Sequence, residues 1–251
     1  MSDKQTKFIA SCSGGKDSVA TLILAKEHGE PLDAVVYAEV MFDHETSGEM
    51  PEHREFVYET LKPFVENKLG VPFHILHAQK TYIDVFTHIN TKGQNIGREY
   101  GFAYPGMCAI NRDCKIPPIK EFWQSVGTDV QQYVGIAADE PERLLRLLDT
   151  NQISLLAKYG VTELEAAHLC QRYGLYSPGY KFSKRNGCWF CPNCKYSEWA
   201  HTIFSHPDLF DKLIDLEVNY PNRARRCLTI NETPSELKSK IMLGGEQLCL
   251  L

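Results

Sequence analysis

The sequence lacks long hydrophobic runs. No apolar stretch among its 251 residues approaches the ~18 consecutive residues expected of a membrane-spanning helix. The opening "MSDKQTK" also lacks the apolar core of a secretory signal peptide. Internal repeats and low-complexity segments are absent too. We therefore expect a cytoplasmic protein that does not contact membranes.

The sequence also lacks a strong excess of charge of either sign. The formal net charge is −5, and charged residues make up 24% of the chain, as in ordinary globular proteins. No global field therefore draws the protein to nucleic acid or to anionic membranes. Two local basic clusters are either solvated faces or phosphate-binding surfaces: Lys181, Lys184 and Arg185, and Arg223, Arg225 and Arg226.

Cysteine, in contrast, is abundant. Nine cysteines, an odd number, are unlike a disulfide framework, which a cytoplasmic protein would rarely carry. Three of them form the C-x-x-C-x-x-C pattern Cys188, Cys191 and Cys194, whose tight two-residue spacers gather thiolates around one point. A metal usually takes four ligands, so we expect a further one from Cys108 or Cys114. The metal is either zinc, as a structural staple, or an iron–sulfur centre.

The stretch "FIASCSGGKDSVATLILAKEHG", residues 8–29, contains a second chemical signal. Its apolar start predicts the end of a buried strand, with Cys12 as a core residue. Val19, Leu22 and Ile23 have the spacing of a helix face. We expect Asp17 or Ser18 to cap this helix and Gly29 to end it. A glycine turn at a helix N-terminus suits a bound phosphate, although the stretch does not match the G-x-x-x-x-G-K-S/T motif.

Strand and helix signals alternate along the first part of the chain. We expect strands within 32–42, 71–78 and 131–140, and helices near 52–69, 82–89, 116–126 and 162–174. This alternation predicts an α/β fold with a parallel sheet. We place a nucleotide-binding α/β domain at residues 1–145. A small helical, cysteine-rich C-terminal subdomain, in which Cys170 belongs to the core, is expected at residues 146–251.

Several charged residues follow predicted strands, at the sheet edge where ligands of parallel sheets bind. Asp139 and Glu140 suit Mg²⁺ on phosphates, and Arg143 could clamp a phosphate or sulfate. The alternative is a helix cap with a surface ion pair. Arg112 and Lys115 lie beside two thiols and attract anions. Four further polar residues occur where a nucleotide sugar would lie: Asp43, His44, Glu49 and His53.

Four motifs together carry a family resemblance. The loop Ser13–Ser18, "CAINRDCKIPPI", "GIAADEPER" and "RNGCWFCPN" occur in the order seen in the phosphoadenosine phosphosulfate (PAPS) reductase-like family. This family is a branch of the PP-loop, or adenine nucleotide alpha-hydrolase, superfamily. The likeness covers about residues 8–200, and "LYSPGY" ahead of the cysteines resembles the phage- and bacterial-type members.

The resemblance implies a Rossmann-like alpha-hydrolase fold that binds an adenine nucleotide: ATP, PAPS or adenylyl sulfate (APS). It also implies a 4Fe–4S cluster of the adenylyl-sulfate reductase kind, with zinc as the alternative. Cys188 and Cys191 match that family's C-x-x-C, but its adjacent cysteine pair has only Cys108 and Cys114 as counterparts. The implied ligands are therefore four of the five cysteines Cys108, Cys114, Cys188, Cys191 and Cys194.

One departure concerns the reductase nucleophile. PAPS reductases end in a Glu-Cys-Gly-x-His motif, whereas this chain ends in "GGEQLCLL", with Cys249 three residues after Glu246. The intact loop with Lys16 and Asp17 resembles ATP-cleaving members, which include tRNA thiolases and DNA phosphorothioation enzymes. The leading hypothesis is therefore ATP pyrophosphatase-type adenylation coupled to sulfur transfer. A PAPS or APS reductase that uses Cys249 is the second hypothesis.

A third hypothesis is a non-catalytic nucleotide- or nucleic-acid-binding module with structural zinc. In that case the basic residues 181–185 and the neighbouring rings of Trp189 and Phe190 would stack on a single strand.

The leading hypothesis assigns roles to particular residues. Lys16, Asp17 and Asp139 are the predicted catalytic residues, with Mg²⁺ on the two aspartates. Predicted partners are a sulfur donor or a thioredoxin-like reductant, a nucleic-acid acceptor, and a second copy of the chain in a homodimer. The predicted nucleotide-binding residues are Ser11, Ser13, Gly14, Gly15, Lys16, Asp17, Ser18, Arg112, Lys115, Glu140 and Arg143.

Overall fold

The computed structural model describes residues 6–106, 108–127 and 129–248, except for the side chains of 245–248. The chain divides into two compact units. Unit 1 takes its described residues from Met1–Glu39, Pro51–His77 and Pro118–Lys181, and unit 2 from Val40–Met50, Ala78–Pro117 and Phe182–Leu251. Within the described part of the chain, every helix is too short or too polar to cross a membrane. Cys249 lies outside the described residues.

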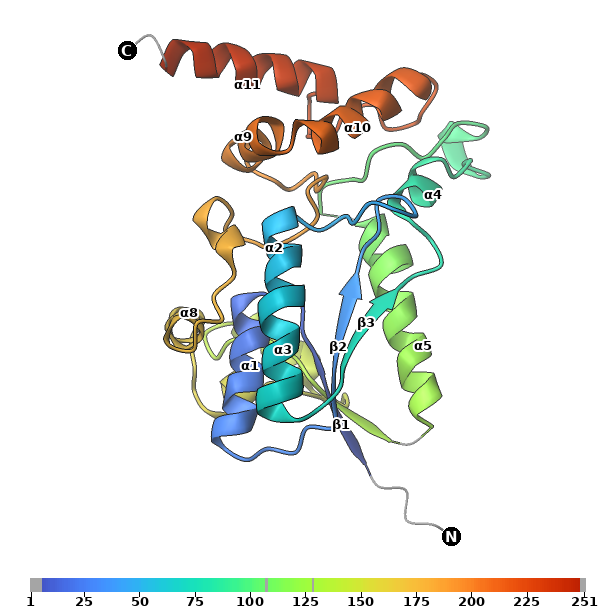
Figure 1. Cartoon of the computed structure of the whole chain (residues 1–251). Helices are drawn as coiled ribbons and strands as arrows, with labels where there is room; N and C mark the ends of the chain where they lie inside the picture. Colours follow the sequence, from blue (N-terminus) through green and yellow to red (C-terminus); the bar gives the residue numbers. More distant parts are fainter. Residues whose placement is uncertain (1–5, 107, 128, 249–251) are drawn as a thin grey trace. The chain divides into compact units, whose positions relative to one another are not determined.

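Unit 1 is built on a five-stranded parallel sheet with the strand order β3-β2-β1-β4-β5. Every pairing is parallel; for example, Ile9 lies opposite Ala34 and Gln132. The predicted α/β fold with a parallel sheet is therefore confirmed (Figure 1). The strands are β1 Lys7–Ser11, β2 Ala34–Glu39, β3 Phe73–His77, β4 Val130–Tyr133 and β5 Gln152–Ile153.

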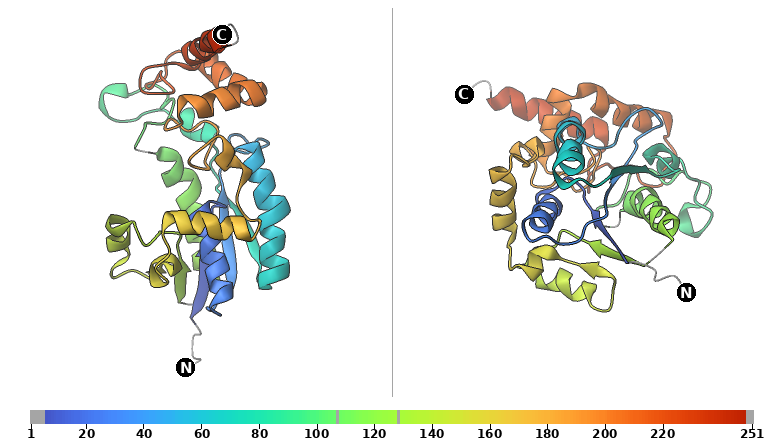
Figure 2. Two further views of the ribbon diagram at one scale, coloured as in Figure 1. Left: turned by 90° about the vertical axis from the view of Figure 1, so that its left-hand side faces the viewer. Right: turned by 60° about the horizontal axis from the view of Figure 1, so that its bottom comes forward.

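The two faces of this sheet are both buried, because successive strand residues point to opposite sides. Ala10, Val35 and Tyr37 join the larger core, together with residues of the helix that follows β1. Ile9, Ala34 and Val36 pack on the other face. The right-hand view of Figure 2 shows α1 and α5 on opposite sides of the strands.

The helices of unit 1 follow the predicted pattern closely. A continuous helical stretch over 51–69 comprises α2, π-type turns, α3 and further π-type turns, and it ends at Gly70 with a φ of 70°. Gly29, with a φ of 64°, follows the end of α1 as expected. Only glycine adopts such angles without strain. The helices are α1 Lys16–Glu27, α2 Pro51–Glu55, α3 Lys62–Phe64, α5 Ile116–Val126, which begins in unit 2, α6 Pro141–Leu144, α7 Leu155–Lys158 and α8 Glu163–Arg172.

Unit 2 is mainly helical around a second apolar core. Helix α10 packs against both α9 and α11. The loop that carries Cys188 is fastened to the segment 47–49: Glu49 and Cys188 form a β-bridge, and the Trp189 N–H donates to the Gly48 carbonyl at 3.0 Å. The helices of unit 2 are α4 Tyr82–Phe86, α9 Tyr196–Ser205, α10 Pro207–Asn219 and α11 Pro234–Leu248.

The division into units differs from the boundary predicted after residue 145. The segments 40–50 and 78–117 belong with the C-terminal helices, and 146–181 belongs with the sheet. The physical reason lies in packing. Phe42, Phe86 and Ile110 contribute to the core of unit 2, whereas Leu156 and Leu169 contribute to that of unit 1. A boundary drawn at one point of the chain cannot represent such a discontinuous arrangement.

Two predictions about the surface are wrong. Trp189 and Phe190 are 1% and 2% exposed, so they form core rather than a stacking platform for nucleic acid. Arg223 is 2% exposed, and it belongs neither to a solvated face nor to a phosphate surface. Its guanidinium group donates to the carbonyls of Glu217, Tyr220 and Arg226. It therefore ties together the chain that follows α10.

Gly135 should be intolerant of any side chain. A Cβ at this position would lie 2.5 Å from the Ser18 nitrogen and 2.7 Å from the Asp17 carbonyl carbon, and both are backbone atoms. We expect Gly135→Ala to lower the free energy of unfolding by about 1–3 kcal/mol, as overpacking does, in chemical denaturation. Gly187→Ala is the control, because nothing lies within 4 Å of that position. Equal stability of the two variants would contradict the close approach.

Candidate functional site

The Ser13–Ser18 loop forms a tight cradle at the carboxyl end of β1. Gly14 has a φ of 75°, and Gly15 is the residue before the helix starts at Lys16. The Ser18 hydroxyl accepts the Ser13 N–H at 3.2 Å and donates to the Gly15 carbonyl at 2.9 Å. The expectation of a cap at Asp17 or Ser18 is thus wrong: Ser18 folds back to brace the loop. At the strand end, the Ser11 hydroxyl accepts from Gln132 at 2.7 Å.

His53 holds this loop from the side. The ring is 1% exposed, and its Nε2 lies 2.9 Å from the Ser13 carbonyl while its Nδ1 lies 2.9 Å from the Ser177 hydroxyl. Because a carbonyl only accepts, the proton on this side belongs to Nε2. Gly14 leaves room for the ring: a Cβ there would lie 2.8 Å from His53 Cε1. The sequence predicted a sugar contact for His53, and it gave no signal of this bracing role.

Lys16 is surrounded by hydrogen-bonding partners. Its ammonium lies 2.9 and 3.0 Å from the Asp17 oxygens and 3.1 Å from a Glu163 oxygen. Burial alone would lower the pKa of Lys16, but these carboxylates outweigh it and raise that pKa. The backbone N–H of Lys16 donates to the Tyr180 hydroxyl at 2.9 Å. Neither Glu163 nor Tyr180 was singled out as a site residue from the sequence.

Asp17 lies in a strongly acidic environment. Burial raises the pKa of its carboxyl group, Lys16 opposes that rise, and Glu163 and Glu140 add to it. The carboxylates of Asp17 and Glu163 therefore share Lys16, and Glu140 acts electrostatically on Asp17. Divalent cations favour such oxygen-rich surroundings.

The residues after β4 show the conventional contacts that the sequence offered as the alternative. An oxygen of Asp139 accepts the Glu163 N–H at 3.0 Å in the first turn of α8, whose N-cap is Thr162. Glu140 accepts the Ala137 N–H at 3.0 Å and pairs with Arg143 at 2.6 Å. The roles predicted for Asp139, Glu140 and Arg143 on Mg²⁺ and phosphate stay predictions.

The cysteine loop of unit 2 turns twice in succession. The Cys191 N–H donates to the Cys188 carbonyl, and the Cys194 N–H to the Cys191 carbonyl, both at 3.0 Å. The neighbouring Cys194 thiol lowers the pKa of Cys191. All three side chains line a cavity of about 90 Å³. Its other lining residues are Met50, Phe182, Ser183, Arg185, Gly187, Asn193, Glu198 and Thr202.

The two candidates for a fourth ligand differ in their surroundings. Cys114 is fully buried, its sulfur lies 3.7 Å from the Thr81 carbonyl, and burial above all raises its pKa to about 11. Cys108 is exposed, and after burial and Glu49 it is one of the smaller contributors to the raised pKa of Cys188. These observations favour Cys108 over Cys114.

An ion pair with one buried partner lies beside the cysteine loop. Lys115 Nζ lies 3.4 Å from a Glu49 oxygen, and the Glu49 side chain is only 3% exposed. Glu49 is the largest cause of the raised pKa of Lys115, and Cys188 and Cys108 contribute to it. Burial first, and Glu49 next, raises the pKa of Cys188, while Lys115 lowers it. Lys115 therefore acts electrostatically on the cysteine loop. Arg112 instead pairs with Asp113 at 2.7 Å. The nucleotide contacts predicted for Arg112 and Lys115 stay predictions.

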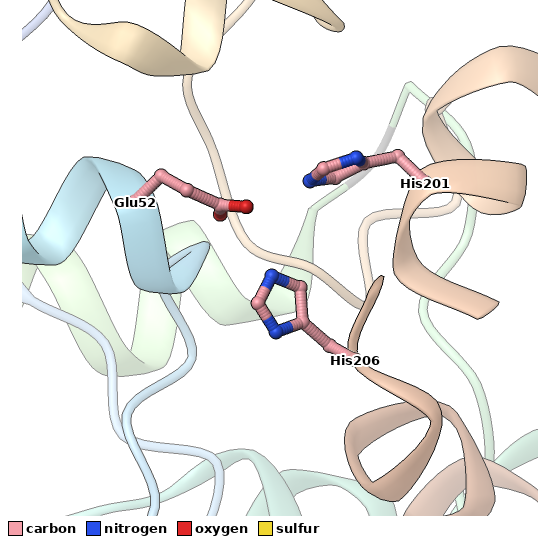
Figure 3. A group of neighbouring side chains, drawn as sticks. All are labelled: Glu52, His201 and His206. Atoms are coloured by element: carbon pink, nitrogen blue, oxygen red, sulfur yellow. The ribbon is translucent and has the colours of Figure 1, made fainter. Parts of the chain in front are cut away.

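A pair of histidines lies in the same unit. The rings of His201 and His206 are 5.6 Å apart, and His201 also stacks on Phe182 at 3.7 Å. Figure 3 shows His201 projecting from α9 and His206 from the turn before α10. The sequence had not singled out either of them.

Solved structures include a protein of similar fold. No protein-family model and no curated protein matches the chain. A solved structure of the U34-tRNA thiolase NcsA from Methanococcus maripaludis, with its 4Fe–4S cluster, is similar to the chain at a TM-score of 0.46 and 16% identity. The likeness covers 96% of this chain and 72% of that one. A likeness of this degree establishes no shared activity.

The raised pKa of Asp17 makes a pH-dependent prediction. The folded state binds this proton more tightly than the unfolded chain, so the charge of Asp17 opposes folding once the pH rises above the ordinary aspartate value of about 3.9. We expect Asp17→Asn to raise the Tm at pH 7 and to leave it nearly unchanged at pH 3. Thermal unfolding followed by circular dichroism measures both.

Asp33→Asn is the matched control for this pH effect. Burial would raise the pKa of Asp33, but Lys7 and the Phe8 N–H lower it overall. Its ionised form therefore stabilises the fold above the unfolded-state value, and that contribution is lost as the pH falls through the lowered pKa. Asp33→Asn should lower the Tm at pH 7. A lower Tm for Asp17→Asn as well would show that the Lys16 pair outweighs burial.

Proposed function

We propose that the chain is an ATP-dependent enzyme of sulfur metabolism. In this proposal it cleaves ATP between the α- and β-phosphates, adenylates an acceptor and then transfers sulfur to it. The observation that carries the proposal is the Ser13–Ser18 cradle, which opens α1 at the carboxyl end of β1 with Lys16 at its first helical position. Ligands of parallel sheets bind at this edge.

The cradle has the properties that a pyrophosphate group requires. The first turn of α1 offers backbone N–H groups and the positive end of the helix dipole. The left-handed Gly14 turns the chain sharply, and His53 keeps that turn in place. Lys16 would stabilise the negative charge that develops on the leaving pyrophosphate.

The carboxylates of unit 1 fit a magnesium ion. Asp17 and Asp139 would hold it; the Glu163 carboxylate accepts from Lys16, and the Glu163 backbone N–H donates to Asp139. When bound, Mg²⁺ neutralises phosphate charge and orients the transferred group. Burial raises the pKa of Asp17, and Glu163 and Glu140 add to that rise, so a cation would favour its ionised form.

The reaction then proceeds in two balanced steps. An acceptor carbonyl oxygen attacks the α-phosphorus, and the α–β bond breaks to release pyrophosphate. A hydrosulfide sulfur next attacks the adenylated carbon, a carbon–sulfur bond forms, and AMP leaves with the former carbonyl oxygen while the proton of the hydrosulfide is released. Nucleic-acid bases with a carbonyl group are acceptors of the right chemistry.

The donor set of unit 2 fits an iron–sulfur cluster better than zinc. Tetrahedral zinc with 2.3 Å bonds would place its sulfur ligands about 3.8 Å apart. Within the described part of the chain, no three cysteine sulfurs lie within 4.8 Å of one another. A 4Fe–4S cluster binds each cysteine through a separate iron and so accepts a wider arrangement. We propose Cys108, Cys188, Cys191 and Cys194 as its ligands.

Such a cluster would supply an iron site with affinity for sulfur anions. The residues of this chain would control its surroundings. Lys115 balances the thiolate charge, and Glu49 fixes the position of Lys115. Trp189 and Phe190 exclude water from the base of the loop.

Turnover of ATP is the first test. We expect the wild-type protein with Mg²⁺ to convert ATP into AMP and pyrophosphate when an acceptor RNA is present. Lys16→Ala should lower this rate by about a hundredfold, because a group that stabilises the transition state is lost. Chromatographic separation of AMP, ADP and ATP measures the products.

Lys62→Ala is the control for a lost lysine, because Lys62 forms only a surface ion pair with Glu66. Sulfite production from PAPS or APS, with no AMP from ATP, would favour the reductase instead. Nucleotide binding without either product would favour a non-catalytic module.

The metal centre is tested by anaerobic purification. We expect broad absorbance near ~400 nm and about four irons per chain. Single serine substitutions at Cys108, Cys188, Cys191 and Cys194 should each lower the iron content, because each removes one ligand. Cys114→Ser should retain it, as should Cys227→Ser as a further control.

Zinc at one equivalent in a colourless protein would overturn the cluster. Iron that disappears in Cys114→Ser but persists in Cys108→Ser would reverse the assignment of the fourth ligand.

A further inference from the structure

The "LYSPGY" segment, residues 175–180, contacts the phosphate cradle directly. Tyr180 accepts the Lys16 N–H with its hydroxyl oxygen at 2.9 Å. The same oxygen would lie 3.3 Å from a Cβ placed on Gly15. Burial raises the pKa of Tyr180 to about 12, so the group is a neutral phenol at physiological pH. A neutral hydroxyl thus sits on the N-terminus of α1.

The ammonium group of Lys16, the cationic donor of the cradle, also has a partner from the same part of the chain. Glu163, the first residue of α8, accepts from the Lys16 ammonium at 3.1 Å. The Glu163 side chain is 49% exposed, whereas Lys16 is 17% exposed. Segment 163–180 therefore supplies one acceptor to the backbone of Lys16 and another to its side chain.

We infer that Tyr180 and Glu163 occupy positions that phosphate oxygens take when a nucleotide binds, and that both must be displaced. The inference rests on the proposed function, because it concerns the same cradle. It assigns to these two residues a role in setting nucleotide affinity.

The physical argument is competition for the same donors. The N–H of Lys16 makes one good hydrogen bond at a time, and it now points at Tyr180. A charged phosphate oxygen is a stronger acceptor than a phenol oxygen, and the helix N-terminus favours a negative charge over a neutral dipole. Exchange of the phenol for phosphate is therefore favourable, but breaking the existing bond reduces the net affinity.

The base of the segment does not need to move for this exchange. Ser177 remains bonded to His53, which braces Ser13. Tyr180 stacks on Tyr176 with ring centroids 4.7 Å apart, and this contact lies outside the cradle. Displacement can therefore be confined to the hydroxyl end of Tyr180 and to the partly exposed carboxylate of Glu163.

Tyr180→Phe tests the inference, because it keeps the ring and removes only the competing oxygen. We expect the variant to bind inorganic pyrophosphate and ATP about fivefold more tightly than the wild type in titration calorimetry, the effect of one hydrogen bond that no longer has to be broken. Glu163→Gln should also tighten binding. Tyr173→Phe is the matched control, since that hydroxyl donates to Glu27 and does not contact the cradle.

Folding of the variant is checked by its Tm and by amide hydrogen exchange. Without ligand, the Lys16 amide should exchange faster in Tyr180→Phe than in the wild type. Its exchange rate in Tyr173→Phe should equal that of the wild type. Equal or weaker pyrophosphate binding by a folded Tyr180→Phe would overturn the inference but not the proposed function. Weaker binding would mean that the Tyr180 hydroxyl is itself a phosphate ligand. Absence of pyrophosphate and ATP binding in both wild type and Tyr180→Phe would overturn the proposed function as well.

Discussion

The hydrogen bond between the buried His53 ring and the Ser13 carbonyl is the constraint on which the candidate site depends. It fixes a glycine turn that would otherwise be free to vary, and the ring itself is held by Ser177. The space for the ring exists only because Gly14 has no side chain. Three distant parts of the chain, at Ser13, His53 and Ser177, therefore determine the direction in which the N–H groups of α1 point.

In both units a lysine at the candidate site is paired with carboxylates. In unit 1 a single lysine is shared by Asp17 and Glu163, and in unit 2 Lys115 is paired with a buried glutamate beside the cysteine loop. Each lysine is thus partly neutralised before any ligand arrives. A bound phosphate or sulfur centre would have to compete with these carboxylates, and a magnesium ion would relieve the crowding of negative charge around Asp17.

Much of the fold was predictable, because hydrophobic periodicity and helix-ending glycines act locally. The helical stretch over 51–69 and the parallel strands follow from alternation and from Gly70. The strand near 131–140 is shorter than predicted, since Gly135 packs on the backbone of α1 and β4 ends at Tyr133. Exposure was predicted less well: Trp189 and Phe190 are buried against the distant Phe42, and Arg223 is buried among carbonyls of its own segment.

By itself the sequence determined the loop that opens α1, the clustering of Cys188, Cys191 and Cys194, and the α/β class, since each depends on residues near one another in the chain. Only the tertiary structure decided what contacts them. Tyr180 lies 164 residues from Lys16 along the chain, and Glu49 reaches Lys115 from another segment of unit 2. Such partners are selected by packing of the whole unit, which no local pattern of residues encodes.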